Sequence, residues 1–423
     1  MFDVIVIGGG AAGFFAALHM VEAQPKLKVA ILEKSHEVLA KVKVSGGGRC
    51  NVTHAEFDPR ELVKNYPRGE KELLGPFHHF GPADTVAFFE RHGIPLKTEG
   101  DGRMFPVSDS SQTIIDFFVE RAEQLHIKVF RHSAVRGVDR GGRTGWKVTT
   151  QRKVYECQKL LIATGSSPKM WQLLKEKGHA IVSPVPSLFT FNCTDPRIKG
   201  VPGVSTRARI EVHQKNKYRA GVKLQLKSSV KKEPLMVSEG PVLVTHWGFS
   251  GPAVLKLSAW GAQLLNELNY HFPMKVNWLP DFHKGGVVPY MMQVKEVEAK
   301  KTIKRTSAFD IPKRLWGHLV LAAGIGPTTR WADATKVELE ALAEQLVDGL
   351  FFINGKSLFK EEFVTAGGVD LKEVDLRTME SKLMDNVYFA GEVINVDAIT
   401  GGFNFQNAWT TGYLAAKAIA GST

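Results

Sequence analysis

The chain has few cysteines for its length. Its 423 residues contain only Cys50, Cys157 and Cys193, and no two of them are spaced as a CxxC motif. An odd number of cysteines without that spacing argues against a disulfide framework and against a thioredoxin-type redox pair. We therefore expect a protein that works in a reducing compartment.

Long apolar runs are also missing. No uninterrupted stretch approaches the roughly 18 apolar residues that a membrane helix requires. The N-terminus places Asp3 before the apolar residues 4–7, so it lacks the positive flank and small-residue cleavage site of a signal peptide. These absences predict a cytoplasmic protein that does not span a membrane.

Acidic residues are fewer than basic ones. Lys and Arg total 55 and Asp and Glu 43, which gives a net charge of +12 and a pI of about 9.4. Such a balance suits an acidic partner, either nucleic acid or an anionic small molecule. The basic residues concentrate in 207–232, where they alternate with apolar ones. This period of two is typical of half-buried strands with a basic solvent face.

The remaining composition is that of a globular protein of two or three domains, with 43% hydrophobic residues and a mean hydropathy of −0.11. The first 35 residues predict a βαβ unit, with strands at 4–7 and 29–32 around a helix at 11–23. Further helices are predicted at 82–92 and 110–126. Short strands are predicted at 127–131, 134–139, 146–150 and 159–163.

The pattern changes near Pro184 and Pro186 to alternating β segments that continue to about residue 245. Helical spacing follows at 286–305, 312–323 and 335–348, and the chain ends in a helix from about Gln406 to Ala420. We therefore predict an α/β protein of three parts. These are a discontinuous nucleotide-binding domain (1–187 and 364–423), an inserted β-rich substrate domain (188–270 and 350–363) and a helical domain (271–349).

A dinucleotide-binding fingerprint lies at residues 8–13. Gly8, Gly10 and Gly13 satisfy GxGxxG directly after a buried strand and at the start of a helix. Gly8 permits the tight turn, Gly10 lets a pyrophosphate approach the backbone, and Gly13 lets the helix pack closely on the strand. Glu33 ends the next strand, where a carboxylate accepts hydrogen bonds from ribose hydroxyls.

Two distant segments favour FAD over NAD. Residues 160–165 form an apolar strand ending in Ala-Thr-Gly, and residues 387–392 form another ending in Gly-Glu. Ligands of doubly wound sheets lie beyond the carboxyl ends of the strands, so these glycines are expected beside residues 8–13. Glu392 could accept a hydrogen bond from a ribityl hydroxyl. Gly401 and Gly402 open the final helix, whose N-terminus would stabilise negative charge on a reduced flavin.

Several motifs together resemble a known family. The segments are 43–53 (KVSGGGRCNVT), 245–252 (THWGFSGP), 366–369, 378–382 and 401–409 (GGFNFQNAW). They are similar to a bacterial flavoprotein family described as BaiN-type NAD(P)/FAD-dependent oxidoreductases or aminoacetone oxidase-like proteins. The resemblance covers nearly the whole chain. It implies a Rossmann-like FAD domain of glutathione-reductase type, interrupted by a β-barrel-like domain and a small helical domain.

The same resemblance implies a set of FAD-contacting residues. They are Gly8, Gly10, Ala11, Ala12, Gly13, Glu33, Lys34, Ser45, Gly46, Gly47, Arg49, Cys50, Asn51, Val135, Thr164, Gly165, Gly391, Glu392, Gly402, Phe403, Asn404 and Gln406.

A catalytic residue is harder to choose. His246 follows an apolar run, and Ser250 is placed to cap a helix beginning near Pro252. We hypothesise that His246 helps bind or deprotonate substrate, against the plainer interpretation of a structural histidine. For Cys50, packing is favoured over redox chemistry. Arg49 and Lys43 could pair with a pyrophosphate or an anionic substrate.

The sequence thus predicts an FAD-dependent oxidoreductase acting on a small amine, carbonyl or enoyl compound. No second glycine fingerprint occurs in 190–360, so electrons would pass to or from oxygen or a transiently bound NAD(P)H. The alternative is a nucleic-acid-binding or tRNA-modifying flavoprotein. It is suggested by the charge and by basic pairs such as Lys304 and Arg305, on helices that could form a helix-turn-helix. Nucleic acid is the less favoured partner, although the basic charge keeps it open.

Overall fold

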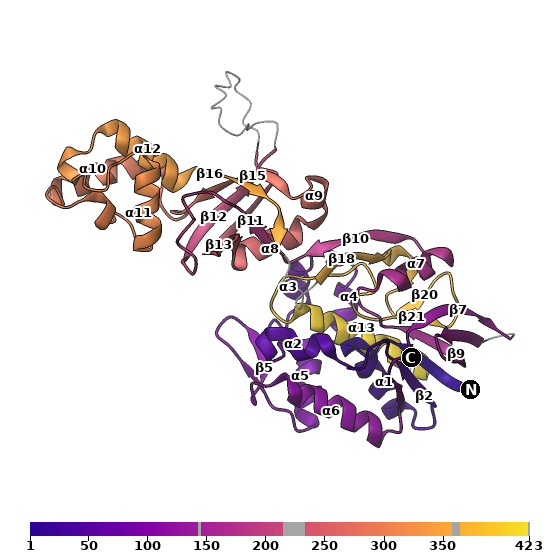
Figure 1. The fold of residues 1–423 in the computed structure, drawn as a ribbon. Coiled ribbons are helices and arrows are strands. Elements are labelled where there is room, and N and C mark those ends of the chain that lie inside the picture. Colours follow the sequence, from indigo (N-terminus) through magenta and orange to yellow (C-terminus); the bar gives the residue numbers. More distant parts are fainter. Residues whose placement is uncertain (143–144, 215–232, 358–363, 422–423) are drawn as a thin grey trace. The chain divides into compact units, whose positions relative to one another are not determined.

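A computed structural model describes residues 1–142, 145–214, 233–357 and 364–421. The chain divides into two compact units (Figure 1). Unit 1 comprises Met1–Ser187 and Lys360–Thr423, and unit 2 comprises Leu188–Phe359. Each unit is described by itself.

The main sheet of unit 1 has nine strands, and its central pairings are parallel. The strand order is β19-β20-β21-β9-β1-β2-β6. The parallel pairs are β21–β9, β9–β1, β1–β2 and β2–β6. The strands β8 and β7 extend the sheet from β9 by antiparallel pairing. The bounds are β1 (Phe2–Ile7), β2 (Val29–Leu32), β6 (Lys128–Phe130), β7 (Val135–Gly141), β8 (Gly145–Thr150), β9 (Val154–Ile162), β19 (Val374–Asp375), β20 (Glu380–Ser381) and β21 (Val387–Phe389). Strands covered on both faces read as continuous apolar runs, which explains residues 4–7 and 160–162.

Two long helices pack against each other in unit 1 (Figure 1). These are α1 (Ala11–Ala23) and α13 (Phe403–Ala420), and Phe15 of α1 contacts Trp409 of α13 with ring centroids 5.0 Å apart. A Cβ atom on Gly412 would lie 3.1 Å from the carbonyl oxygen of Ala12, so glycine permits this close approach. The other helices are α2 (Ala40–Gly48), α3 (Pro59–Leu62), η1 (Val63–Asn65), α4 (Leu74–His79), α5 (Pro82–Arg91), α6 (Ser111–Gln124), α7 (Pro168–Glu176) and η6 (Leu371–Glu373).

Two smaller sheets complete unit 1. One has three antiparallel strands, β3 (Thr53–His54), β5 (Arg103–Pro106) and β4 (Leu96–Thr98). The other pairs β10 (Ile181–Ser187) with β18 (Val364–Val369), also antiparallel. In this pair Ser187 lies opposite Val364, so the chain leaves unit 1 and returns to it at neighbouring positions.

The described residues of unit 2 form a seven-stranded antiparallel sheet with the order β16-β15-β12-β13-β14-β11-β17. The bounds are β11 (Thr190–Asn192), β12 (Ser205–Val212), β13 (Met236–Val244), β14 (Gly248–Ser250), β15 (His271–Asn277), β16 (Gly349–Asn354) and β17 (Lys356–Ser357). The helical elements are α8 (Pro252–Trp260), α9 (Ala262–Glu267), η3 (Lys284–Gly286), α10 (Val287–Val297), η4 (Ile303–Arg305), α11 (Lys313–Ala322), η5 (Trp331–Asp333) and α12 (Lys336–Val347). Strands and helices share one apolar core.

The expected α/β class with a Rossmann-like domain is confirmed, and most expected elements are present. Three details differ. The helix predicted at 286–305 ends at Val297, the final helix begins at Phe403, and α8 has Gly251 as its N-cap, so Ser250 does not cap it. Of the basic stretch 207–232, residues 215–232 lie outside the described residues. The three-part domain division remains a prediction.

The three cysteines are buried and free, and no helix in the described ranges is long and apolar enough to cross a bilayer.

Candidate functional site

The glycine loop lies where β1 ends and α1 begins. A Cβ atom on Gly8, which has a φ of +114°, would lie 2.3 Å from the Ala163 carbonyl oxygen, and one on Gly13 would lie 2.0 Å from the Gly8 carbonyl oxygen. Neither glycine can carry a side chain without a shift of the backbone. A Cβ atom on Gly10 meets no atom of the described chain within 4 Å, so this side of the loop is open. The three glycines therefore have the environments that their spacing predicts.

Glu33 follows β2 and faces the same loop. Its Oε2 accepts a hydrogen bond from the Gly9 amide at 2.8 Å, and its Oε1 accepts one from the Ser35 amide at 2.8 Å. These two bonds hold the carboxylate against the glycine turn. A carboxylate can accept about four hydrogen bonds, so Glu33 keeps acceptor capacity for a hydroxyl group.

The ends of β9 and β21 lie beside the glycine loop. A Cβ atom on Gly391 would lie 3.0 Å from the Cβ of Ala12, and one on Gly165 would lie 3.5 Å from Glu392 Oε2. The Thr164 hydroxyl is buried and has no hydrogen-bond partner among the described residues. An unpaired buried hydroxyl is costly, so a polar ligand group at this strand end would relieve it.

Glu392 also bonds within the protein. It forms an ion pair with Lys41 of α2, and its Oε1 accepts a hydrogen bond from the Thr365 amide at 2.9 Å. Lys41 in turn donates to the Ser166 hydroxyl at 3.3 Å. The sequence did not single out Lys41, because one lysine in a helix carries no motif signal.

The glycine-rich segment 45–49 includes the end of α2, where Ser45, Gly46 and Gly47 depart from helical geometry. Gly46, Gly47 and Gly48 have φ values of +58°, +68° and +85°, a backbone conformation that other residues rarely adopt. Cβ atoms on Gly47 and Gly48 would meet no described atom within 4 Å, so this segment presents bare backbone. The amide of Leu39, at the start of α2, donates to the Gly9 carbonyl at 2.8 Å. Segment 45–49 is thus joined to the glycine loop through α2.

The start of α13 lies on the far side of this segment. With its amide group turned, the Asn51 side-chain oxygen accepts a hydrogen bond from the Gly402 amide at 2.9 Å. A Cβ atom on Gly402 would lie 2.4 Å from the Thr53 carbonyl oxygen. The Gln406 side chain is fully buried, and its Oε1 accepts bonds from the hydroxyls of Thr53 and Thr85. These contacts fix the position of the helix N-terminus.

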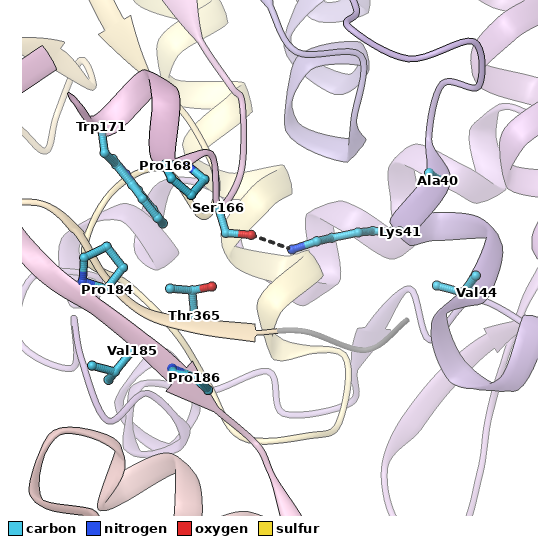
Figure 2. A pocket seen from close by; sticks show the side chains of 10 residues that line it. All are labelled: Ala40, Lys41, Val44, Ser166, Pro168, Trp171, Pro184, Val185, Pro186 and Thr365. Atoms are coloured by element: carbon cyan, nitrogen blue, oxygen red, sulfur yellow. Dashed lines mark hydrogen bonds between the residues drawn. The ribbon is translucent and has the colours of Figure 1, made fainter. Parts of the chain in front are cut away.

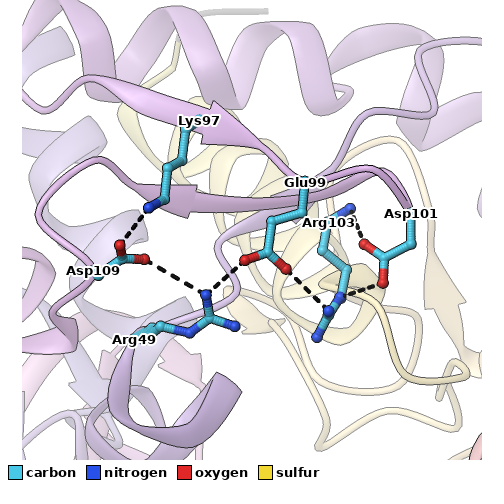
Figure 3. Close-up of polar contacts among 6 residues, drawn as sticks. All are labelled: Arg49, Lys97, Glu99, Asp101, Arg103 and Asp109. Carbon is cyan, nitrogen blue, oxygen red and sulfur yellow. Dashed lines mark hydrogen bonds and ion pairs between the residues drawn. The ribbon is translucent and has the colours of Figure 1, made fainter.

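Arg49 lies in a cluster of charges rather than in open space (Figure 3). Its guanidinium is 2.6 Å from Glu99 and 3.6 Å from Asp109, and it covers the Phe105 ring at 4.0 Å. The bonds from Lys97 and then Arg49 lower the pKa of the Asp109 carboxyl. Arg103 pairs with Glu99 and Asp101. Lys43 pairs with Glu37 at 3.2 Å.

A cavity of about 560 Å³ opens beside Lys41 (Figure 2). Its lining is mainly apolar and comes from α2, α7, β10, β18 and the residues after β9. The lining residues are Ala40, Lys41, Val44, Ser166, Pro168, Trp171, Pro184, Val185, Pro186 and Thr365. The cavity therefore combines apolar walls with a cation and hydroxyl groups at one side.

Two further residues near the α13 entry were not predicted. The ring of His54 stacks on Phe403 with centroids 4.5 Å apart, and its Nδ1 is buried without a hydrogen-bond partner in the described ranges. Arg68 forms a buried ion pair with Asp397, and Ser187 donates to the same carboxylate at 2.7 Å. Burial raises the pKa of Asp397, and the bond from Arg68 opposes this shift. The folded chain brings these residues together from distant positions, so local sequence carries no signal for them.

The remaining predicted residues differ in burial. Cys50 is fully buried, and burial raises the pKa of its thiol to about 12, so it is a poor nucleophile. The side chain of Lys34 is exposed. Val135 begins β7, two residues after Ser133, whose amide donates to the Glu33 carbonyl at 2.7 Å. His246 lies in unit 2, exposed in the turn between β13 and β14.

These observations fit a bound dinucleotide cofactor. Strand ends from residues 8–13, 164–165 and 391–392 meet at one edge of a parallel sheet, where ligands of this architecture bind. Gly47 and Gly48 present open backbone, and the N-terminus of α13 is held in place by Asn51. The partial positive charge of that helix N-terminus suits an anionic flavin. This geometry defines a Rossmann-type flavoprotein.

The family follows from comparison with known proteins. The model of the HI0933-like protein Rossmann domain matches residues 2–418, and the chain belongs to this family. It is an FAD-dependent oxidoreductase, as its motifs predicted.

Three relatives match over nearly their whole lengths. A ribosomal RNA dihydrouridine synthase of Escherichia coli (strain K12) is 30% identical over 98% of this chain and 97% of its own. A protein of the same description from Haemophilus influenzae (strain ATCC 51907 / DSM 11121 / KW20 / Rd) is 27% identical over 98% of both chains. A 3-dehydro-bile acid delta(4,6)-reductase of Clostridium scindens (strain ATCC 35704 / DSM 5676 / VPI 13733 / 19) is 25% identical over 98% of both.

Proposed function

We propose that this protein reduces an electron-poor carbon–carbon double bond with electrons from FAD, and that the bond lies in a uracil base of ribosomal RNA. The convergence of three glycine-bearing strand ends at one edge of the sheet supports FAD as the electron carrier. The relatives support the reaction class, because dihydrouridine synthesis and delta(4,6)-reduction both saturate a double bond conjugated with a carbonyl group.

FAD, when bound, supplies two electrons as a hydride equivalent. The residues proposed to hold it are the FAD-contacting set that the family resemblance implies. Lys41, which pairs with Glu392, is added to this set. Hydride addition to one carbon of the double bond must be matched by a proton on the other. His54, next to the α13 entry, and His246, exposed in unit 2, are the proposed proton donors. A transiently bound NAD(P)H would reduce the flavin again.

The choice of RNA as substrate rests on charge. A surplus of twelve positive charges favours a polyanion, whose phosphates attract Lys and Arg without regard to sequence. A small enone is the second candidate, because the cavity beside Lys41 is walled by apolar residues such as Trp171 and Pro168. The chemistry required is the same for both substrates: one hydride, one proton and a reduced flavin.

The experiment uses the FAD-loaded protein under anaerobic conditions with NADH or NADPH. Unmodified ribosomal RNA transcript is one substrate and a 3-oxo-4,6-diene bile acid is the other. We expect flavin bleaching by the nicotinamide, reoxidation by the transcript, and uridine made two hydrogens heavier by mass spectrometry. A protein reoxidised only by the bile acid would reassign the substrate, and one reoxidised by neither would refute the reaction class.

The two histidines are tested separately with His54→Asn and His246→Asn. Loss of a proton donor should lower the rate of product formation at least tenfold while bound flavin and its reduction by NAD(P)H stay unchanged. An unchanged rate in either variant would remove that histidine from the proton step.

A further inference from the structure

A basic stretch of unit 2 has almost no acidic residues. From residue 299 to residue 332, Asp310 is the single acid. The basic residues of this stretch are Lys300, Lys301, Lys304, Arg305, Lys313, Arg314 and Arg330. Helical spacing predicted a helix that includes the first four, but α10 ends at Val297, and residues 303–305 form the short 3-10 helix η4.

Backbone pairing holds this stretch together. The Ile303 amide donates to the Thr329 carbonyl at 3.0 Å, and the Trp331 amide donates to the Lys301 carbonyl at 2.9 Å. Thr302 and Arg330 lie opposite each other in an antiparallel bridge. The residues around η4 are therefore neighbours of Arg330, although they lie far from it along the chain.

The start of α11 joins the same surface. The indole of Trp316 donates to the Ile303 carbonyl at 2.7 Å, so η4 packs on α11. A Cβ atom on Gly317 would lie 3.5 Å from Lys304 Cγ, which shows that the Lys304 stem crosses the helix at this glycine. Lys313 precedes Gly317 by one helical turn and shares its face. Lys304 thus packs on the helix that carries Lys313.

Most of these cations lack a counter-charge. Within the described ranges, Lys300, Lys304, Arg305, Lys313 and Arg330 have no carboxylate within ion-pair distance. Elsewhere in unit 2, Arg207 pairs with Glu239 and Asp281, and Lys275 pairs with Asp348. Uncompensated charges on a rigid scaffold produce a positive surface potential.

We propose that this surface, the η4–α11 face (Lys300, Lys304, Arg305, Lys313 and Arg330), binds the phosphate backbone of folded RNA. The inference rests on the proposed RNA substrate and assigns it a docking surface. Thr302 and Thr306 add hydroxyl donors of the kind that contact phosphates. A membrane surface would instead require exposed apolar side chains among the cations, and Ile303 and Ile311 are buried.

The test compares two double variants of the full-length, FAD-loaded protein. Lys304→Gln with Lys313→Gln removes two charges from the face. Arg207→Gln with Lys336→Gln removes two charges from ion-paired positions of the same unit. The probe is a fluorescent uridine-containing RNA stem–loop, and anisotropy is measured over a series of salt concentrations.

We expect the face variant to bind at least about tenfold more weakly than the parent, with a salt slope lower by roughly 1.5. The control variant should stay within about twofold of the parent. Equal affinity and slope for the face variant and the parent would overturn the inference. So would a parent that binds vesicles of anionic phospholipid but not the RNA.

The RNA-binding test of the η4–α11 face and the test of uridine reduction can fail independently of each other. If the parent binds RNA through the face but never reduces uridine, the docking surface stands and the reaction is wrong. If uridine is reduced and the face variant matches the parent in affinity and rate, the reaction stands and the docking surface is wrong.

Discussion

Gly10 caps α1 and Gly13 lies in its first turn, but their surroundings differ. A Cβ atom on Gly10 would point into open space, whereas one on Gly13 would collide with the Gly8 carbonyl oxygen at 2.0 Å. Gly10 also has ordinary dihedral angles, with φ −96° and ψ −170°. The fold therefore requires a glycine at position 13 but not at position 10.

Substitution of each glycine by alanine should distinguish the two positions. Gly10→Ala should leave the melting temperature of the FAD-free protein unchanged but weaken FAD binding about tenfold or more, because the methyl group would occupy space needed by the pyrophosphate. Gly13→Ala should destabilise the FAD-free protein by about 1–3 kcal/mol. Thermal melts and flavin titration of both variants provide the measurement. Parental FAD affinity in Gly10→Ala would contradict the placement of the cofactor at this loop.

A buried histidine, a glutamate and a serine are arranged like a catalytic triad but have a structural role. His179 Nδ1 lies 2.8 Å from Glu373, and its Nε2 lies 3.0 Å from the Ser381 hydroxyl, as in a hydrolase triad. His179 and Ser381 are buried, and Ser381 Oγ accepts the amides of Leu383 and Met384. A hydroxyl oxygen engaged in this way is not available for attack. The contacts instead hold β20 and η6 against the loop before β10.

At the scale of elements, the start of α13 depends on a buried polar network. Gln406 Oε1 accepts bonds from Thr53 at 2.6 Å and Thr85 at 2.9 Å, and its Nε2 donates to Thr410 at 3.1 Å. All four side chains are fully buried. The network joins β3, α5 and α13, and so it fixes where the helix N-terminus points.

Gln406→Leu should therefore affect both stability and the cofactor. Removing the amide leaves buried threonine hydroxyls without their partner, at a cost of about 2–4 kcal/mol. We expect a lower melting temperature and weaker flavin retention, measured by calorimetry and by absorbance after gel filtration. Gln172→Leu, on the exposed face of α7, is the matched control and should change neither. If both variants behave like the parent, the network does not position α13.

At the scale of the whole molecule, unit 2 is an insertion with neighbouring ends. Ser187 and Val364 are directly paired in the β10–β18 ladder, and opposite residues of antiparallel strands lie about 5 Å apart. Each unit has its own apolar core, so neither depends on the other for burial of its apolar side chains.

Replacing residues 188–363 with a Gly/Asn turn of about two to four residues should thus leave unit 1 folded. We expect a yellow protein that retains FAD, melts cooperatively, and has lost uridine reduction together with RNA binding. Absorbance, calorimetry and the anisotropy assay check these three properties. A colourless or aggregated product would show that unit 2 is needed for the FAD site.

The sequence alone determined the cofactor class and the strands and glycine turns around the candidate site. Buried parallel strands read as continuous apolar runs, and the glycines after β1 have local steric reasons, so residues 4–13 and 160–165 could be interpreted without coordinates. The segment 45–51 was identified instead by its resemblance to a known family. These features depend on neighbours in the chain, which is why pattern and spacing reveal them.

The tertiary structure alone decided which side chains meet across long separations. Lys41 with Glu392, Arg68 with Asp397, and the η4–α11 face each join residues that no local pattern connects. It also showed that Arg49 is held by Glu99 and that Cys50 is buried in apolar surroundings. Ion pairing and burial depend on distances set by packing of the whole chain, and a linear sequence does not contain those distances.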